Sequence, residues 1–395
     1  AKRGSTPRAR SSLPPACLAM APLPMPSEEA VARAARTFEG VVLDVDEPAG
    51  RCTYFQDRNK RWPFFTSAQG HVSLQKLVFT AARLVAVADA RLVALAADGE
   101  RLRREGENIY ARKPNKKSED VTWSQREYAH AGLQREYVRF KSVQRFTETW
   151  AALERAHAMG ALHAAADAHA RGGGACRVAS LGGGPGFELY AYQSYFEKHF
   201  PSVRLECVSL DLAEEWAPYC DALGIRFDVW NVHDGESLLA KTGGPVDYAV
   251  ISYVLHHYFV CLQSNKPMAQ WIGEWLNSPS PPPALAESLA ELPATPTTLG
   301  EACAPRGIIV IGRDENLGRE MAIFEQAKVR CVRLIDQSGG RDDRQLLLLP
   351  ANAPPPQPIK SEPSLTFENV PFEEHKGRRG RGGGGGGGGG GSGGG

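Results

Sequence analysis

The stretch CRVASLGGGPGFELYAYQSYFEKHF, residues 176–200, decides the fold of this chain. Its apolar run from Val178 to Leu181 predicts a β-strand that leads directly into the glycine-rich turn 182–186, and a helix is expected after the turn. Glycines let a ligand approach the backbone, and the first N–H groups of a helix attract a carboxylate or a phosphate. The stretch therefore predicts a ligand-binding turn between a strand and a helix.

The spacing of the glycines excludes two common nucleotide sites. The dinucleotide fingerprint GxGxxG, started at Gly182, would place its last glycine at Phe187, and no GxxxxGK[ST] phosphate loop occurs in the chain. The pattern that fits is LGxGxG, with Gly182, Gly184 and Gly186 as its glycines.

The next two apolar runs end in side chains that suit an adenosine ligand. The run RLECVSLD closes on Asp211, whose carboxylate can accept hydrogen bonds from both ribose hydroxyls, and Leu212 can pack on the adenine face. The run IRFDVW is followed by Asn231, with Asp234 close behind. Either of these two side chains can receive the adenine amino group.

Strands and helices are expected to alternate from Arg177 onward. The expected strands are 177–181, 204–210, 225–230, 247–253, 307–312, 328–335 and 344–349, and the expected helices are 187–199, 213–223, 265–276 and 317–327. Such alternation predicts an α/β fold with a parallel sheet and helices on both faces. The last two strands are joined only by DQSGGRDD, so they should form an antiparallel hairpin. The Pro-rich segment 277–305 is expected to be a surface insertion.

This pattern resembles the class I S-adenosylmethionine-dependent methyltransferase family over residues 177–350. The resemblance implies a Rossmann-like sheet of seven strands in the order 3-2-1-4-5-7-6, S-adenosylmethionine as cofactor and methyl transfer as activity. The implied cofactor contacts are Gly182, Gly184 and Gly186 under the methionine part, Asp211 at the ribose, Leu212 and Asn231 or Asp234 at the adenine, and Ser252 and Tyr253 beside the methyl group.

One position departs from the family pattern. Many members carry an acid two residues before the first glycine of the turn, where this chain has Ser180. The departure weakens the expected hold on the methionine amine, so a catalytically inactive relative that binds RNA or a protein stays open beside an active enzyme. The [DNS]PP[YF] tetrad of base-amine methyltransferases is also absent, with SYVL in its place. This argues against the usual DNA-adenine or cytosine-N4 chemistry and leaves other RNA positions, small molecules and proteins open.

His256 and His257 follow the fourth expected strand, where the methyl group should point. A histidine there can deprotonate a hydroxyl or an amine near neutral pH, and we predict this role for His256. Tyr253 is the second catalytic candidate, with core packing as its alternative. A histidine that caps the following helix, or that is buried and satisfied, is the alternative for His256.

The residues before the turn divide into two parts. Residues 1–37 are expected to be a disordered leader, whose basic, Ser- and Pro-rich beginning (1–27) also suits an organellar transit peptide. Residues 38–165 are expected to be mainly helical, with short strand-like runs before a helix at 71–104. A second helix carries an aromatic stripe and ends near Gly160; the stripe suits core packing, with a cofactor lid as the alternative.

Residues 351–395 are expected to be a disordered Pro-rich linker followed by an Arg/Gly-rich tail. The tail, with Arg378, Arg379 and Arg381, resembles the RGG segments of RNA-associated proteins. An expected loop at 111–120 adds Lys113, Lys116 and Lys117. Because flexible basic segments attract phosphates, RNA is the preferred substrate here, ahead of a small molecule or a protein. A glycine repeat without a role is the alternative for the tail.

Composition limits the partners, metal sites and locations that remain open for this protein. The net charge of +1 gives no overall field toward nucleic acid or membrane, and no apolar run approaches the ~20 residues that span a bilayer. The eight cysteines form no CxxC pair, so Cys176, Cys207 and Cys261 are expected as buried free thiols rather than parts of a disulfide or metal framework. A soluble protein of the nucleus or cytoplasm is expected, or of an organelle if residues 1–27 are a transit peptide.

Overall fold

The computed structural model describes residues 27–35, 41–47, 50–56, 61–65, 70–95, 98–112, 123–172, 174–232, 234–235, 237–254, 266–277, 305–312, 317–334 and 344–356. Several predictions fall outside these residues. They concern the transit peptide, the lysines of the basic loop, His256, His257, Cys261, the insertion after Asn277 and the Arg/Gly-rich tail.

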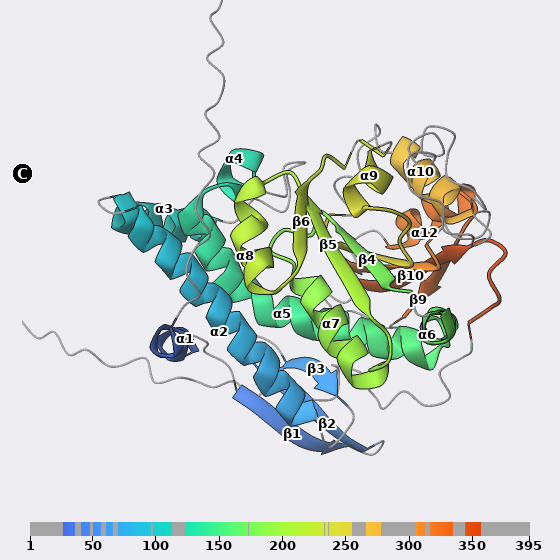
Figure 1. Ribbon diagram of the computed structural model, residues 1–395, viewed down its shortest axis with the longest axis horizontal. Helices are drawn as coiled ribbons and strands as arrows, with labels where there is room; N and C mark the ends of the chain where they lie inside the picture. Colours follow the sequence, from blue (N-terminus) through green and yellow to red (C-terminus); the bar gives the residue numbers. More distant parts are fainter. Residues whose placement is uncertain are drawn as a thin grey trace, which may run out of the picture. The chain divides into compact units, whose positions relative to one another are not determined.

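A seven-stranded sheet organises the C-terminal half of the chain (Figure 1). Its strands are β4 (Cys176–Leu181), β5 (Leu205–Asp211), β6 (Arg226–Val229), β7 (Tyr248–Ser252), β8 (Gly307–Gly312), β9 (Val329–Arg333) and β10 (Arg344–Pro350). They lie in the order β6-β5-β4-β7-β8-β10-β9, which is the predicted order 3-2-1-4-5-7-6. Strands β4 to β8 are parallel, and β10 is antiparallel to β8 and β9, so the predicted terminal hairpin is confirmed.

Helices cover both faces of this sheet, as predicted. Those that follow the strands are α7 (Phe187–His199), α8 (Ala217–Ala222), α9 (Leu238–Thr242), α10 (Lys266–Asn277) and α12 (Leu317–Gln326). Successive strand residues point to opposite faces. Val178 and Val250 accordingly join one buried apolar cluster with α7 and α8, whereas Ala179 and Ile251 join a second with α9, α10 and α12. Only α9 was missed among these helices, because five residues are too few for a helical period.

The N-terminal region contains a separate three-stranded antiparallel sheet and six helices among the described residues. They are α1 (Glu28–Ala35), β1 (Val41–Glu47), β2 (Gly50–Gln56), β3 (Arg61–Phe65), α2 (Gly70–Ala94), α3 (Gly99–Arg112), α4 (Gln125–Tyr128), α5 (Ala131–Ala158) and α6 (His163–Gly172). The strand-like runs predicted before residue 70 are the strands of this small sheet.

Two predictions for the N-terminal region are wrong in part. The single helix at 71–104 is two helices, because the chain turns at Leu95 and α3 begins at Gly99. Gly99 is needed there, since a Cβ atom would lie 2.1 Å from the carbonyl oxygen of Leu92. The predicted disordered leader, residues 1–37, also extends too far. Its end forms α1, where the backbone N–H of Ala30 donates to the Ser27 hydroxyl across 3.3 Å.

Helix α5 links the two halves of the chain, since it packs against α2 and α3 on one side and against α7 on the other. Its apolar stripe is mostly buried, with Phe146, Trp150 and Leu153 at 1% exposure or less. Core packing therefore describes the stripe, apart from Phe140, which is 48% exposed.

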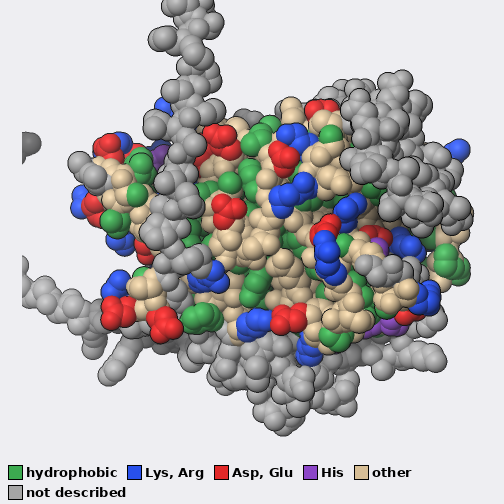
Figure 2. Space-filling view, viewed as in Figure 1, with side chains coloured by type: hydrophobic (Ala, Val, Ile, Leu, Met, Phe, Trp, Pro, Cys, Tyr) green, Lys and Arg blue, Asp and Glu red, His purple; other side chains and the backbone are tan. Residues whose placement is uncertain are grey.

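The face of the molecule in Figure 2 shows Lys and Arg side chains interspersed with Asp and Glu over the described residues. No gathering of one sign marks a phosphate-binding surface on the described part of that face. Within the part of the chain that the structure describes, no helix is long and apolar enough to cross a membrane.

Candidate functional site

The glycine turn lies between β4 and α7, as predicted, at the carboxyl ends of the parallel strands. Gly182, Gly184 and Gly186 all have left-handed backbones, with φ of 72°, 48° and 80°. Other residues adopt this conformation only at a cost of about 1–2 kcal/mol, so the turn requires glycine at these three positions. The turn is anchored to β5, because the N–H groups of Gly182 and Gly183 donate to the carbonyl of Leu210 across 2.8 and 3.0 Å.

Gly183 is a position that the sequence pattern left out. A Cβ atom there would lie 2.5 Å from the Ser209 hydroxyl and 2.6 Å from the Ser180 hydroxyl. Only glycine fits against these two buried serines, which are register partners on β5 and β4. The middle glycine therefore holds the turn against the sheet, while its neighbours shape the path of the chain.

Asp211 ends β5 beside the glycine turn, where the sequence predicted a ribose-binding acid. One carboxylate oxygen accepts the N–H of Gly184 across 2.9 Å, and the other accepts the N–H of Ala213 across 3.0 Å. Burial raises the pKa of this carboxyl group, and the N–H groups of Ala213 and Gly184 oppose that shift. Each carboxylate oxygen can accept a further hydrogen bond, so the side chain can still accept hydrogen bonds from the two hydroxyls of a diol. Leu212 next to it is 41% exposed.

An aromatic wall flanks the turn, formed by Tyr137, Phe187 and Trp216. The ring of Trp216 would lie 3.8 Å from a Cβ atom on Gly184. Tyr137, from α5, has its ring centroid 5.6 Å from that of Trp216 and 6.2 Å from that of Phe187. The space beside Gly184 is thus bounded by the Trp216 ring and, at 3.9 Å, by the Asp211 carboxylate.

The adenine candidates lie past the end of β6, and both Asn231 and Asp234 are exposed. The Asp234 carboxylate accepts the backbone N–H of Ser237 across 3.1 Å, just before α9. Its main-chain carbonyl accepts the indole N–H of Trp230 across 2.7 Å. Asp234 therefore shapes the loop that carries Asn231, and the choice between them for the adenine amino group stays a prediction.

Ser252 and Tyr253 lie where β7 ends. Ser252 is buried, and Tyr253 has a φ of 60°, one of two positive values among the described non-glycine residues. Such strain persists only where the surroundings fix it, and it is commonest at functional sites. The Tyr253 phenol donates to Glu148 across 2.9 Å and accepts from Gln144 across 3.0 Å. The predicted base, His256, lies outside the described residues.

Four polar residues meet between α5, α7 and the end of β7, and we call Gln144, Arg145, Glu148 and Glu188 the buried charge cluster. The Arg145 guanidinium lies 3.2 Å from Glu148, 3.9 Å from Glu188 and 3.2 Å above the centre of the Tyr253 ring. All three charged side chains are 5% exposed. Burial raises the pKa of both carboxyl groups, and Arg145 opposes the shift.

This cluster was not predicted from the sequence. A polar stripe on an amphipathic helix is ordinarily the solvated face, and nothing in the α5 sequence shows that α7 covers it. Glu188 offered the better signal, because an acid in the first turn of the helix after the glycines lies inside the predicted site.

Several observations indicate that the residues at this end of the sheet fit S-adenosylmethionine. The turn can follow a ligand closely only because its glycines are left-handed, and α7 begins without a side-chain cap, which leaves its first N–H groups for a carboxylate. The Ser180 hydroxyl is buried without a hydrogen-bond partner among the described residues. In this arrangement the turn, Asp211 and the buried charge cluster would hold the cofactor.

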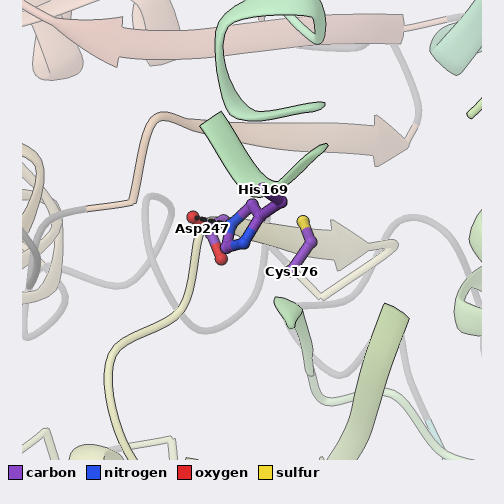
Figure 3. Close-up of side chains that lie close together, drawn as sticks. All are labelled: His169, Cys176 and Asp247. Atoms are coloured by element: carbon purple, nitrogen blue, oxygen red, sulfur yellow. Dashed lines mark hydrogen bonds and ion pairs between the residues drawn. The ribbon is translucent and has the colours of Figure 1, made fainter. Parts of the chain in front are cut away.

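A second cluster lies at the amino ends of β4 and β7, at the far end of the sheet. Figure 3 shows the His169 ring against the Asp247 carboxylate, with the Cys176 thiol beside them. The His169 Nε2 and Asp247 Oδ1 atoms are 3.0 Å apart, and the other Asp247 oxygen accepts the backbone N–H of Arg177 across 2.9 Å. Burial, followed by the charge of Asp247, raises the pKa of the thiol.

These three residues have ligand atoms within 4.8 Å of one another, which is close enough to consider a metal ion. Both carboxylate oxygens are already engaged, and the Arg306 Nε atom lies 3.8 Å from one of them. A cation would displace these contacts and face the guanidinium. The cluster therefore fits a link between α6 and the sheet better than a metal centre.

No family model matches this chain, and no curated protein matches it. Similar solved structures include a TehB-like S-adenosylmethionine-dependent methyltransferase from Corynebacterium glutamicum, which is 10% identical over 50% of this chain and 95% of that one, with a TM-score of 0.28. An O-methyltransferase family protein from Burkholderia thailandensis is 13% identical over 68% and 73%, with a TM-score of 0.32. A putative class I methyltransferase from Listeria monocytogenes is 11% identical over 84% and 92%, with a TM-score of 0.33.

The strand order and the glycine turn, rather than these distant likenesses, carry the assignment of the fold. Five parallel strands are followed by a hairpin whose last strand inserts beside β8, and the turn after the first strand faces the acid after the second. The described residues between 176 and 350 form a Rossmann-like sheet with the strand order predicted from the resemblance to class I S-adenosylmethionine-dependent methyltransferases.

Proposed function

We propose that this protein is an S-adenosylmethionine-dependent methyltransferase. The observation that carries the proposal is the pairing of the left-handed glycine turn with Asp211, whose carboxylate contacts the backbone of Gly184. In open α/β sheets, ligands bind beyond the carboxyl ends of the strands, and this pairing is at that end. The cofactor supplies a methyl group on a positively charged sulfur, so the protein has mainly to bind, orient and accept a proton.

Each predicted side chain has a definite task in this proposal. The turn and Asp211 fix the cofactor, and Tyr253, held by Glu148 and Gln144, fixes the end of β7 beside the acceptor. His256 is proposed as the base that takes the proton of the acceptor. A base in that position typically contributes about 10²–10⁴-fold, so His256→Ala should lower turnover far more than cofactor affinity. A variant with a lower melting temperature and normal turnover per folded molecule would contradict this role.

Calorimetric titration of the full chain with S-adenosylmethionine tests the cofactor site. Gly184→Ala and Gly224→Ala form a matched pair, because both replace a left-handed glycine, with φ of 48° and 68°, and each should cost about 1–2 kcal/mol of stability. Only the Cβ atom on Gly184 enters the space between Trp216 and Asp211, whereas that on Gly224 meets nothing within 4 Å. Cofactor affinity should therefore fall in the first variant alone.

Asp211→Ala should weaken cofactor binding at least about tenfold, since a lost hydrogen bond to a charged group costs ~1.5–3 kcal/mol. Undiminished affinity in this variant would remove the ribose assignment. A wild-type chain that binds no S-adenosylmethionine would contradict the proposed function itself and favour an inactive relative.

RNA is the proposed substrate, on the strength of the Arg/Gly-rich tail and the basic loop in the sequence. The test is incubation with labelled cofactor and a cell extract separated into RNA, protein and metabolites. Label is expected in RNA, and replacement of Arg378, Arg379 and Arg381 by Gln should reduce it. Label in the metabolite or protein fraction alone would replace RNA with that substrate class.

A further inference from the structure

The buried charge cluster has two acids and one base, and Lys141 donates to Gln144 beside it across 3.0 Å. Arg145 is its one cation, and it faces two carboxylates, Glu148 and Glu188, at 3.2 and 3.9 Å. Asp211 adds a third carboxylate close enough to Glu188 for the two charges to affect each other. Burial raises the pKa of all three carboxyl groups, and a cation that enters this region would stabilise their charged forms.

These acids lie at the proposed cofactor site rather than elsewhere in the core. Glu188 is the second residue of α7, directly after the turn, and its carboxylate also faces the Ser252 hydroxyl at the end of β7. Glu148 reaches the same place from α5, where it accepts the Tyr253 phenol across 2.9 Å. Two carboxylates from different helices therefore border the ends of β4 and β7.

The charge of the cofactor complements these acids. S-Adenosylmethionine carries a sulfonium, an ammonium and one carboxylate, so its net charge is +1. Loss of the methyl group leaves a neutral thioether, so S-adenosylhomocysteine has no net charge. A buried negative site should distinguish the two, because electrostatic interactions strengthen where water is excluded.

We propose that Glu148 and Glu188 face the sulfonium and make the site prefer the positively charged cofactor to its neutral product. Arg145 holds the two carboxylates in place before binding, so that they need no rearrangement to meet a cation. The preference would favour release of the product after each transfer. This inference rests on the proposed function.

The first test needs no variant. Calorimetry on the full chain compares S-adenosylhomocysteine with sinefungin, an analogue that has an amine-bearing carbon in place of the sulfonium and is stable. Sinefungin should bind at least about tenfold more tightly, as expected for a buried contact between opposite charges. Equal affinities would overturn the proposal. A chain that binds neither ligand would instead overturn the proposed function.

The second test locates the preference in the two carboxylates. Glu188→Gln and Glu148→Gln should each weaken sinefungin about tenfold and S-adenosylhomocysteine by less than about threefold. Glu136→Gln is the matched control, because Glu136 is also buried on α5 but pairs with Arg135 and Arg139. It should leave both affinities unchanged. Equal losses for the two ligands in the first two variants would show a structural role and overturn the proposal.

Discussion

Acids lie beside bases at both ends of the central sheet, but the two ends differ in how these groups are paired. At the amino ends, Asp247 has a partner for each oxygen, namely His169 and the backbone of Arg177. At the carboxyl ends, one guanidinium serves Glu148 and Glu188 together, and Tyr253 has a strained backbone. One end is therefore satisfied within the protein, whereas the other has more acids than bases and a strained backbone.

The difference indicates where the fold departs from its most stable arrangement. Natural proteins break local rules of charge and backbone conformation mainly at functional sites, where the departure serves binding or chemistry. The satisfied cluster should therefore affect stability alone. The unbalanced one should affect both stability and ligand affinity.

The largest effect is expected from removal of the central cation. Arg145→Met should lower the free energy of unfolding by about 3–5 kcal/mol, because two buried carboxylates lose their partner. Denaturant unfolding monitored by circular dichroism measures this. Adding Glu148→Gln and Glu188→Gln to the same chain should restore much of the loss.

Arg101→Met is the control for Arg145→Met, since Arg101 pairs with Asp98 and Glu105 on the exposed side of α3. No measurable loss is expected there, because exposed ion pairs are screened by water. Similar unfolding curves for both methionine variants would mean that the cluster is not a charged network.

The satisfied end of the sheet should respond in stability only. Asp247→Asn keeps the shape of the side chain but replaces one acceptor oxygen with an amide, which cannot accept from both His169 and the Arg177 N–H. A loss of about 1–3 kcal/mol is expected, with cofactor affinity unchanged. A loss of affinity in a stable variant would break the comparison, because it would link the far end of the sheet to the site.

Local patterns in the sequence predicted most of what lies near the glycine turn. The strand, the turn and α7 follow from one stretch of 25 residues, and the acid at Asp211 follows from the length of the next apolar run. The break before α3 was also readable, because Asp98-Gly99-Glu100 is a helix-start pattern inside the expected helix. The break was not predicted because the apolar and alanine-rich residues on both sides of it favoured one continuous helix.

The buried charge cluster could not be predicted in the same way. Glu148 and Tyr253 are 105 residues apart in the chain, and their contact depends on how α5 lies across the sheet. A sequence shows that α5 is amphipathic but not that its polar side meets α7. The strain at Tyr253 is also tertiary in origin, because it depends on contacts with Gln144 and Arg145.

Two groups on α7, the half-buried His199 at its end and the buried Glu188 in its first turn, should give stability opposite pH dependences. Burial lowers the pKa of His199 to about 4, so its contribution to stability is present above the ordinary histidine pKa of 6.5 and is lost as pH falls toward 4. Burial raises the pKa of Glu188, so its contribution is present below 4.5 and is lost as pH rises through the folded pKa.

Melting curves from pH 4.5 to 8 test the two groups separately. His199→Gln should flatten the acid side by on the order of 2–4 °C, allowing for solvent screening of this half-buried ring. Glu188→Gln should flatten the alkaline side. If both variants altered the same side, the assignment of the two groups would be wrong.

The smallest effect concerns two serines that are register partners beneath the turn. Ser180 has an orphaned hydroxyl, whereas Ser209 donates to the carbonyl of Gly184 across 3.1 Å. Ser180→Ala should change stability by less than about 1 kcal/mol, because it removes a buried group without a partner among the described residues. Ser209→Ala should cost about 1 kcal/mol, because it removes a hydrogen bond that holds the turn.

Cofactor affinity in Ser180→Ala then decides whether the Ser180 hydroxyl contacts the methionine amine. If it does not, affinity should stay within about twofold of the wild type, since a hydrogen bond that is absent cannot be lost. A tenfold loss would show that the orphaned hydroxyl finds its partner in the ligand. Ser180 would then fill the role of the family's acid at this position, beside the two carboxylates on α5 and α7.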